Sequence, residues 1–390
     1  MLERFTATAF KTLREVQIDL GTINVFVGAN GSGKSNLLEA IGVLGAAASG
    51  RVNDESLKYR GVRPGLPILY KSSFRNTPGA RHIKFEAKSP DASYLVSLWN
   101  PTDTPLSDWK YKHESLISGD VRVVGRSPAS YSSLNENAGL AALKAVELAP
   151  EDSAGQLLDL LRNYAIYSVD TPTLRGLEPD PQSREPVGLA GGRLPEALQS
   201  LLQNGKGLGS LFDMLPLVDW LARVSVTYSK ELPISASVPQ QQKGLRFKDR
   251  FMTDGRNILS AYDASEGVLY LLFYTVLALH HNTPKLFAID NFDQALNPRV
   301  AREFTRMFCN WLVESNDRQV LLTTHNPLVL DGLPLQDDRV RLFAVDRSKQ
   351  GKTVVHRVEV NESLLKSARK GIPLSQQWVN GDFGGIPSDV

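Results

Sequence analysis

The sequence predicts an α/β fold, and three patterns along the chain support this prediction. From residue 268 onward, short apolar strands alternate with helical segments, which is typical of a parallel sheet with crossover helices. Near the N-terminus, a glycine-rich loop at 28–35 separates an apolar strand from a helix. Between residues 81 and 98, apolar and polar residues alternate, as they do in antiparallel strands.

The composition is that of an ordinary globular protein. The chain has 390 residues, of which 42% are hydrophobic and 22% charged, so it is long enough for two domains or for one domain with an insertion. The net charge of +2 argues against a polycation dedicated to nucleic acid. Cys309 is the only cysteine, which excludes an internal disulfide and disfavours a thiol-ligated zinc site. Without a long apolar run, we expect a soluble, cytoplasmic protein with no membrane contact.

The glycine-rich loop is the most specific motif of the chain. Residues 16–18 and 23–27 predict two short strands, and residues 36–44 predict the helix that follows the loop. Between them, residues 28–35 match the phosphate-loop pattern G-x-x-x-x-G-K-[ST]. The match lies directly after an apolar strand and directly before a helix, which is the context that this pattern requires. Backbone N–H groups at the glycines would approach phosphate oxygens, Lys34 would reach the outer phosphates and Ser35 would bind Mg²⁺. The candidate nucleotide-binding residues are Asn30, Gly31, Ser32, Gly33, Lys34, Ser35 and Asn36.

Two further strands end in polar residues that suit such a site. The apolar run 286–289 ends at Asp290, and the run 320–323 leads to His325. Asp290 alone could equally be a helix-capping residue, but beside a phosphate loop it predicts a Mg²⁺ ligand. Because parallel strands carry such groups at their carboxyl ends, both side chains should lie at the same edge of the sheet as the loop. A helix at 299–313 and a strand at 340–345 complete this predicted region.

The middle of the chain has a different character. Residues 134–226 show mostly an amphipathic helical pattern, interrupted by a loop rich in proline and glycine at 171–192. The pattern contains no sustained heptad repeat. A long coiled-coil arm is therefore excluded.

Together these motifs resemble the ABC ATPase heads of SMC, RecF and OLD-type proteins, including stand-alone prokaryotic ATPases with the same head. The match covers both ends of the chain in order and spacing, and only loosely the middle third. It rests on the opening at 10–16, the phosphate loop with Asn36, a signature-like run at 263–269, Asp290 at the Walker B position, a D-loop at 295–298 and a switch histidine, His325, within 324–327.

The resemblance implies a nucleotide site shared between two chains. In such heads, ATP on one phosphate loop is covered by the signature motif of a second head, so two ATP molecules are held in a dimer. Here Ser265, Glu266 and Gly267 would supply that cover, because they open an apolar helix whose N-terminus suits phosphate. The resemblance therefore implies ATP and Mg²⁺ as cofactors and a second copy of the chain as a partner.

One position departs from the family pattern. The glutamate that usually follows the Walker B acid, and that acts as general base, is replaced by Asn291. An amide orients a water molecule but cannot accept its proton, and general-base catalysis is worth about 10²–10⁴ in rate. We therefore expect slow hydrolysis, or replacement of the missing base by Asp293. The predicted catalytic residues are Asp290, Asn291, Asp293 and His325.

The resemblance also implies a two-lobed head. We expect a first lobe at 1–126 with the phosphate loop and a mixed or antiparallel sheet, a helical insertion at 127–240, and a second lobe at 241–390 with a parallel sheet, the signature, the Walker B acid and the switch histidine. The glutamine that senses magnesium in related heads is not placed.

A basic stretch offers a possible contact with DNA. The segment 58–84 contains no acidic residue and seven basic ones, namely Lys58, Arg60, Arg63, Lys71, Arg75, Arg81 and Lys84. Such a stretch is either a phosphate-contacting face or ordinary solvated surface. No interleaved aromatic residues and no helix-turn-helix pattern accompany it.

Three functions follow from these patterns. The first is a defence ATPase that switches a separate effector such as a nuclease, because the roughly 65 residues after His325 are too few for the nuclease domain of OLD proteins. The second is a RecF-like repair ATPase that binds DNA and loads other proteins. The third, a transporter subunit, is disfavoured because about 230 residues separate the loop from the signature, against roughly a hundred in transporters.

Overall fold

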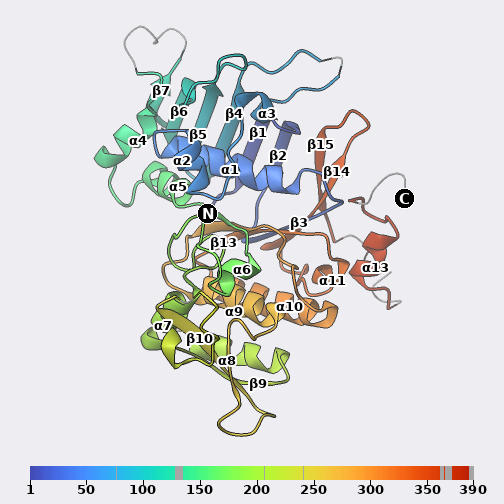
Figure 1. Cartoon of the computed structure of the whole chain (residues 1–390). Coiled ribbons are helices and arrows are strands. Elements are labelled where there is room, and N and C mark those ends of the chain that lie inside the picture. Colours follow the sequence, from blue (N-terminus) through green and yellow to red (C-terminus); the bar gives the residue numbers. More distant parts are fainter. Residues whose placement is uncertain are drawn as a thin grey trace.

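The computed structural model describes residues 1–75, 77–127, 135–205, 207–239, 241–360, 364 and 371–385. Figure 1 shows an antiparallel sheet at one end, a second six-stranded sheet in the middle, and helices with a small sheet at the other end. The predicted boundary at residue 240 and the last five residues lie outside the described residues.

The first sheet is antiparallel throughout, with strand order β2-β1-β4-β5-β6-β7. Its strands are β1 (Arg4–Phe10), β2 (Leu13–Asp19), β4 (Ile83–Ser89), β5 (Ala92–Trp99), β6 (Lys110–Ser118) and β7 (Val121–Arg126). The alternating pattern between residues 81 and 98 is therefore confirmed as a pair of antiparallel strands. One face of this sheet packs against α1 (Lys34–Ala48) and α5 (Ser153–Arg162).

The second sheet, called here the central sheet, has the order β15-β14-β3-β13-β12-β8. Its strands are β3 (Ile23–Val27), β8 (Ala165–Tyr167), β12 (Leu286–Ile289), β13 (Gln319–Thr324), β14 (Val340–Arg347) and β15 (Thr353–Val358). All pairings are parallel except that of β15 with β14. The predicted strands near 286, 320 and 340 are confirmed, because each is a short apolar run buried on both faces.

The topology corrects the expected division of the chain in two respects. Strand β3, expected in the first lobe, lies inside the central sheet between β13 and β14, because its five residues are all buried and need cover on both faces. The expected helical insertion also contributes strands, namely β8 to the central sheet and β9 (Leu221–Tyr228) to a third sheet. Strand β8 has only three residues, too few to show a period of two. The boundaries at 126 and 240 remain a prediction.

Two hydrophobic cores lie on opposite faces of the central sheet. Along β12, for example, Phe287 and Ile289 join the core formed with α9 (Glu266–Leu279) and α10 (Pro298–Ser315), whereas Ala288 joins the core formed with α1. The helix after the phosphate loop and the helix after the signature motif therefore cover different faces. Although α9 is almost entirely apolar, no helix among the described residues is long and apolar enough to span a membrane.

The third sheet is small and lies at the opposite end of the molecule from the first sheet (Figure 1). Its order is β11-β10-β9, with β10 (Lys243–Asp249) and β11 (Ile258–Ser260) both antiparallel to their neighbours. Helix α7 (Leu194–Asn204) packs against β9 and β10, and α8 (Leu208–Met214) packs against α9. Further α-helices within the described residues are α2 (Asp54–Lys58), α3 (Pro67–Tyr70), α4 (Leu140–Lys144), α6 (Thr171–Leu174), α11 (Pro327–Leu330) and α13 (Leu374–Val379).

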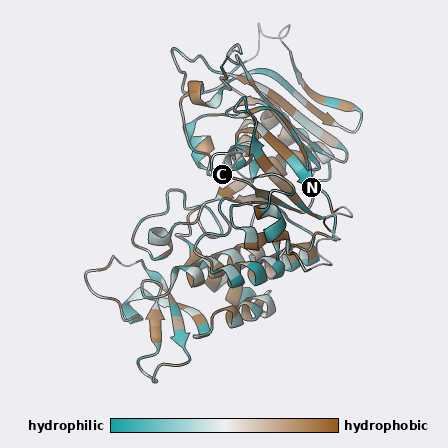
Figure 2. Cartoon of the chain, turned by 90° about the vertical axis from the view of Figure 1, so that its right-hand side faces the viewer, coloured by the Kyte–Doolittle hydropathy of each residue, from teal (hydrophilic) through white to brown (hydrophobic). Residues whose placement is uncertain are grey.

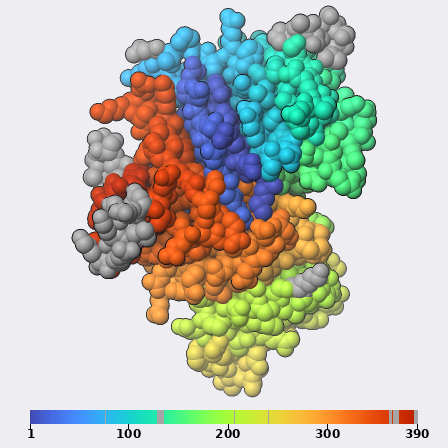
Figure 3. Space-filling view, turned by 180° about the vertical axis from the view of Figure 1, so that it is seen from behind, coloured from blue at the N-terminus to red at the C-terminus, as the bar shows by residue number. Residues whose placement is uncertain are grey.

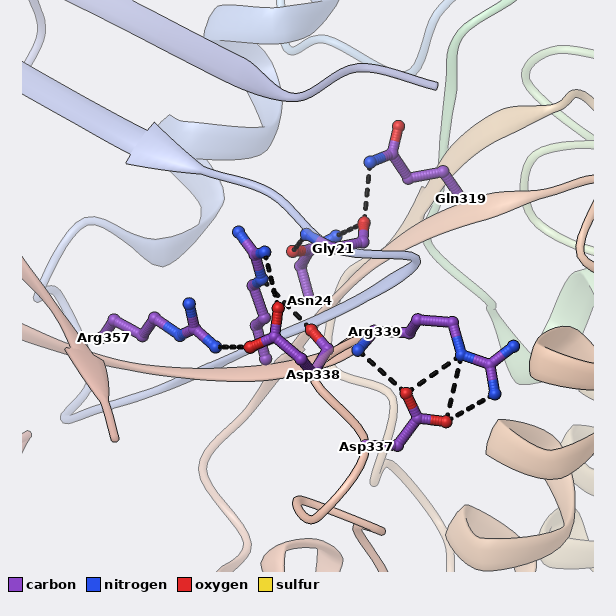
Figure 4. Close-up of polar contacts among 8 residues, drawn as sticks. Gly21, Asn24, Gln319, Asp337, Asp338, Arg339 and Arg357 are labelled. Carbon is purple, nitrogen blue, oxygen red and sulfur yellow. Dashed lines mark hydrogen bonds and ion pairs between the residues drawn. The ribbon is translucent and has the colours of Figure 1, made fainter. Parts of the chain in front are cut away.

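The N-terminal and C-terminal segments of the chain lie next to each other. Seen from behind, the N-terminal residues (dark blue) form a band between the C-terminal strands (red) and the antiparallel strands (light blue) (Figure 3). At the amino ends of the central strands, the side chain of Gln319 donates to Gly21 O at 2.7 Å, and Asn24 closes the same turn (Figure 4). The nearby pairs of Arg339 with Asp337 and of Arg357 with Asp338 are also at this edge. Side-chain hydrogen bonds and ion pairs therefore hold this edge of the central sheet together. The candidate nucleotide-binding site lies at the opposite edge.

Candidate nucleotide-binding site

Three neighbouring strands of the central sheet end at one edge and carry the predicted site. Strand β13 lies between β3 and β12, so the phosphate loop after Val27, the switch histidine after Thr324 and the acid after Ile289 follow adjacent strand ends. Thr324 lies opposite Val27 in the register. The expectation that Asp290 and His325 reach the same edge as the loop is thus met by the topology.

The glycines of the loop are required by its conformation. Gly31 and Gly33 have φ angles of 78° and 111°, in the left-handed region that side chains disfavour. A Cβ atom on Gly33 would also lie 2.1 Å from Thr353 Oγ1, and one on Gly28 would lie 2.2 Å from Val345 O. The loop is therefore packed tightly against β14 and β15, with Asn30 and Gly31 exposed at its crest.

Lys34 lies buried beneath the loop. Its Nζ donates to Gly28 O at 2.7 Å and to Ala29 O at 3.0 Å. Burial lowers the pKa of Lys34, and the nearby carboxylates of Asp290 and Asp293 oppose this shift. Ser32 Oγ is buried with no hydrogen-bond partner among the described residues. A buried ammonium and an unsatisfied hydroxyl fit a loop that binds an anionic ligand.

Ser35 and Asp290 form the candidate Mg²⁺ site. Ser35 Oγ donates to Asp290 Oδ1 at 3.1 Å, and Thr323 Oγ1 donates to the same oxygen. A hydroxyl and a carboxylate suit Mg²⁺, which usually takes one or two protein carboxylates and completes its shell with phosphate and water. Among the described residues no group of three or more His, Cys, Asp or Glu side chains gathers.

Asn291 occupies a strained position directly after the candidate metal ligand. Its φ of 57° lies in the left-handed region, which Asn tolerates better than most residues. Its backbone N–H donates to Thr323 Oγ1 at 2.8 Å, so one threonine hydroxyl contacts both Asp290 and Asn291.

Asp293 and His325 face each other across the end of β13. Asp293 is buried, and its Oδ1 accepts a hydrogen bond from Thr324 Oγ1 at 2.7 Å. Its other oxygen, Oδ2, lies 3.6 Å from His325 Nε2, and the His325 side chain is about half exposed. Both oxygens of Asp293 are thus directed at neighbouring side chains, an arrangement that suits positioning of His325.

A network that the sequence analysis missed holds the loop from outside. Thr353 Oγ1 donates to Ser32 O at 2.8 Å and lies 2.6 Å from Thr12 Oγ1. Asn36 Nδ2 donates to Thr12 Oγ1 at 2.8 Å, and Arg347 Nη1 donates to Gly31 O at 3.0 Å. Thr12 lies within the family-like opening of the chain, whereas nothing in the sequence singles out Thr353 or Arg347, because they reach the loop only through the folding of β14 and β15.

The signature motif is not brought onto this loop. Ser265 is the N-cap of α9, but its side chain makes no capping hydrogen bond. Ser265 and Glu266 are exposed, and a Cβ atom on Gly267 would lie 3.0 Å from Ala295 O of the D-loop. Since α9 and α1 cover opposite faces of the central sheet, the predicted signature residues Ser265, Glu266 and Gly267 lie apart from the loop of the same chain.

The predicted basic stretch is only partly available. Arg60 is buried and donates to Ser56 O at 2.8 Å and to Arg162 O at 2.9 Å, and burial lowers its pKa to about 10. Lys71 is buried and donates to Asn100 O. Arg63 pairs with the buried Glu39 at 2.6 Å. Arg63 is itself exposed, as are the remaining members Lys58, Arg75, Arg81 and Lys84.

Comparison with known proteins agrees with this geometry. The family model described as "AAA domain, putative AbiEii toxin, Type IV TA system" matches residues 23–141 and 189–331, which is more than half of the chain. The DNA replication and repair protein RecF of Magnetococcus marinus is 32% identical over 102 residues, covering 24% of this chain and 27% of that protein. RecF of Renibacterium salmoninarum is 40% identical over 55 residues, or 14% of each. The chain thus matches only about a quarter or less of these curated relatives.

Solved SMC heads share the fold across nearly the whole chain. An SMC head bound to the C-winged-helix domain of ScpA matches with a TM-score of 0.54 and 13% identity, covering 93% of this chain and 99% of that one. An SMC head with an extended coiled coil, bound to the C-terminal domain of ScpA derived from Pyrococcus furiosus, matches with a TM-score of 0.50 and 12% identity, covering 95% and 98%. The chain therefore belongs to the AAA-domain family named above, resembles RecF over about a quarter of its length, and has the fold of SMC heads.

Proposed function

We propose that this chain binds ATP and Mg²⁺, pairs with a second copy around two nucleotides, and uses that pairing to switch a separate effector. One observation carries the pairing. The phosphate loop is packed against β14 and β15 with Lys34 buried beneath it, whereas Ser265 and Glu266 stand exposed and uncapped at the start of α9, over the other face of the central sheet. A helix N-terminus with exposed N–H groups suits the outer phosphates of ATP on a neighbouring chain.

The residues of one loop would act together on the triphosphate. Backbone N–H groups between Gly31 and Lys34 would hold the phosphates, and the ammonium of Lys34 would exchange its two carbonyl partners for phosphate oxygens. Ser35 and Asp290 would hold Mg²⁺, which neutralises charge on the outer phosphates. Thr323 would keep Asp290 in place through its hydroxyl.

Hydrolysis should be slow, because the attacking water lacks an obvious base. The side chain of Asn291 can orient a water molecule but cannot take its proton, which costs about 10²–10⁴ in rate. Asp293 is engaged by Thr324 and faces His325, so we assign it to positioning the histidine. The ATP-bound pair would therefore live long enough to serve as a signal.

The effector is proposed to be a nuclease in prokaryotic anti-phage defence. Two observations support this proposal. The description of the matching family refers to a toxin and a toxin–antitoxin system, and the described residues hold no cluster of three or more acidic, His or Cys side chains that could form a metal-dependent cutting centre. A partner would then supply the output, while this chain supplies the ATP-driven switch.

A RecF-like role in DNA repair is the second candidate. It is favoured by the RecF proteins among the relatives, whose printed name is DNA replication and repair protein. In this reading the paired heads bind DNA and load other proteins onto it, with Lys58, Arg75, Arg81 and Lys84 as predicted contacts. ATP-dependent binding to gapped DNA without any partner would distinguish this role from the defence role. Replication genes next to the gene for this chain, in place of a nuclease or toxin gene, would do the same.

Sedimentation of the purified chain with and without ATP and Mg²⁺ tests the proposal. We expect a monomer without nucleotide and a dimer with it, stabilised further by a non-hydrolysable ATP analogue. A monomer at all nucleotide concentrations, in protein that demonstrably binds ATP, would falsify the pairing while leaving the assignment of the phosphate loop intact.

A further inference from the structure

The small sheet β9–β10–β11 has a basic outer face. Along β10 the buried residues Leu245 and Phe247 point to the core, so the alternate residues Arg246 and Lys248 point outward, and both are exposed. Arg223 on β9 lies directly opposite Lys248 and is also exposed. These three cations, Arg223, Arg246 and Lys248, are called here the basic sheet face. The small sheet lies at the end of the molecule remote from the antiparallel sheet (Figures 1 and 2).

The cations of this face are crowded and poorly neutralised. Lys248 opposes Arg223 directly, and Arg246 lies opposite Ser225, two residues from Arg223. Like charges placed directly opposite each other on neighbouring strands are destabilising. Within the described parts of the chain, the guanidinium groups of Arg223 and Arg246 have no ion pair or hydrogen bond, and Lys248 has only the exposed Asp254, at 3.6 Å. The face thus maintains an unfavourable concentration of positive charge.

The local sequence has the same bias. Residues 221–260 contain seven Lys and Arg but three Asp and Glu, whereas the whole chain is nearly balanced at 44 and 42. Of the three acids, Asp249 is buried and accepts hydrogen bonds from Phe251 N at 2.7 Å and Met252 N at 3.1 Å, and Glu231 accepts one from Thr227 Oγ1. Asp249 and Glu231 therefore serve local turns, and among the described residues only the exposed Asp254 pairs with a cation of the basic sheet face.

An exposed aromatic ring stands at the end of β10. Phe251 is 75% exposed, although it is held in an ordered turn by the carboxylate of Asp249. The turn is anchored further by Arg250, whose N–H donates to Trp220 O at 2.9 Å and whose Nη2 donates to Leu221 O at 2.7 Å. An ordered, solvent-facing ring three residues after Lys248 offers a surface on which a base can stack while phosphates pair with the cations, as in proteins that bind single-stranded nucleic acid.

We propose that the basic sheet face binds single-stranded nucleic acid, with phosphates on Arg223, Arg246 and Lys248 and a base stacked on Phe251. The site lies apart from the predicted basic stretch at 58–84 and does not depend on nucleotide binding. It is connected to the signature motif by the chain itself. Strand β11 ends at Ser260, whose N–H and hydroxyl both bond to Asp263, two residues before Ser265.

Fluorescence polarisation with a labelled oligothymidylate of about 30 nucleotides tests this proposal. We expect the wild type to bind it, with an affinity that falls steeply between low and moderate salt. In Arg223→Glu/Arg246→Glu/Lys248→Glu the affinity should fall at least tenfold, and the slope of log K against log salt should decrease by about 2, since about 0.7 is lost per phosphate contact. Phe251→Ala should weaken binding about fivefold or more and leave the slope unchanged.

The matched control is Arg51→Glu/Arg122→Glu/Lys285→Glu, which makes the same change in net charge at three exposed cations outside both basic regions and should bind like the wild type. ATP binding and thermal unfolding report whether each variant folds. If the charge reversal unfolds the protein, Arg223→Ala/Arg246→Ala/Lys248→Ala relieves the repulsion and should lose affinity likewise. The proposal is wrong if the wild type does not bind the oligonucleotide, or if the variants of the basic sheet face bind it with unchanged affinity. It is also wrong if polyglutamate competes equally per charge and Phe251→Ala has no effect on the affinity. That last result would indicate an acidic protein as the partner.

Discussion

The phosphate loop and the signature motif each lie at the N-terminus of a helix, a position that suits phosphate binding, but the surroundings of the two motifs differ. The loop is tied by Thr353, Arg347 and its own buried lysine, and its helix is nearly all buried. At the signature, Ser265 makes no capping bond and is exposed together with Glu266.

In the proposed function, this difference decides which half-site is complete within one chain. A tied loop is preorganised for its ligand, so little ordering is needed when ATP binds. An N-cap serine normally accepts a bond from its own helix, and one that does not leaves N–H groups for an external acceptor. In the proposed function the loop therefore binds nucleotide by itself, and the signature needs nucleotide presented by another chain.

The largest expected effect is that of Lys34→Ala. It removes the only ammonium beneath the loop among the described residues and should weaken ATP binding about 10- to 100-fold, the usual value of a charged hydrogen-bonding group. Isothermal calorimetry measures this, with Lys352→Ala on the nearby turn as control. If Lys34→Ala binds ATP with wild-type affinity, the loop is not part of the nucleotide site.

Ser265→Arg should separate the two half-sites. A bulky cation at the start of α9 should weaken ATP-dependent self-association at least tenfold, because it blocks close approach of a second loop, while each monomer still binds ATP normally. Sedimentation and calorimetry on the same sample report both quantities, and Ser107→Arg, at an exposed loop serine, is the control. Association that survives Ser265→Arg contradicts the shared site.

The third prediction concerns turnover. We expect phosphate release well below about 1 s⁻¹, the lower end of typical enzyme rates. Asp293→Ala should reduce this rate about tenfold or less, because Asp293 positions His325 and is not the base. Release at or above about 1 s⁻¹ that is abolished by Asp293→Ala would instead make Asp293 the base. Thermal unfolding of Asp293→Ala distinguishes lost stability from lost catalysis.

The smallest effect is expected from Thr353→Val, which tests how the loop is tied. The change keeps the shape but removes the bonds to Ser32 O and Thr12 Oγ1, which should cost about 1 kcal/mol of stability. The KM for ATP should rise a few-fold with kcat nearly unchanged, since the loop is less ordered before binding. Thr104→Val, at an exposed position, should alter neither quantity.

Much of the site was predictable because its motifs are local. The phosphate loop, Asp290 and His325 each follow an apolar strand, so the sequence places them at strand ends and the rule for parallel strands brings them together. Thr323 and Thr353 were not predictable as site residues, because a threonine within a strand is ordinary. Likewise, a run of lysines and arginines does not reveal that Arg60 and Lys71 are buried structural residues.

By itself, the sequence predicted the chemistry of the candidate nucleotide site and determined the class of the fold, because contiguous motifs and hydrophobic periodicity encode loops, strand ends and buried faces. The tertiary structure alone decided that β3 lies within the central sheet, that α1 and α9 cover opposite faces of it, and that Arg223 stands opposite Lys248. These facts depend on strand order and register, which arise from contacts between residues far apart in the chain. No local pattern records such contacts.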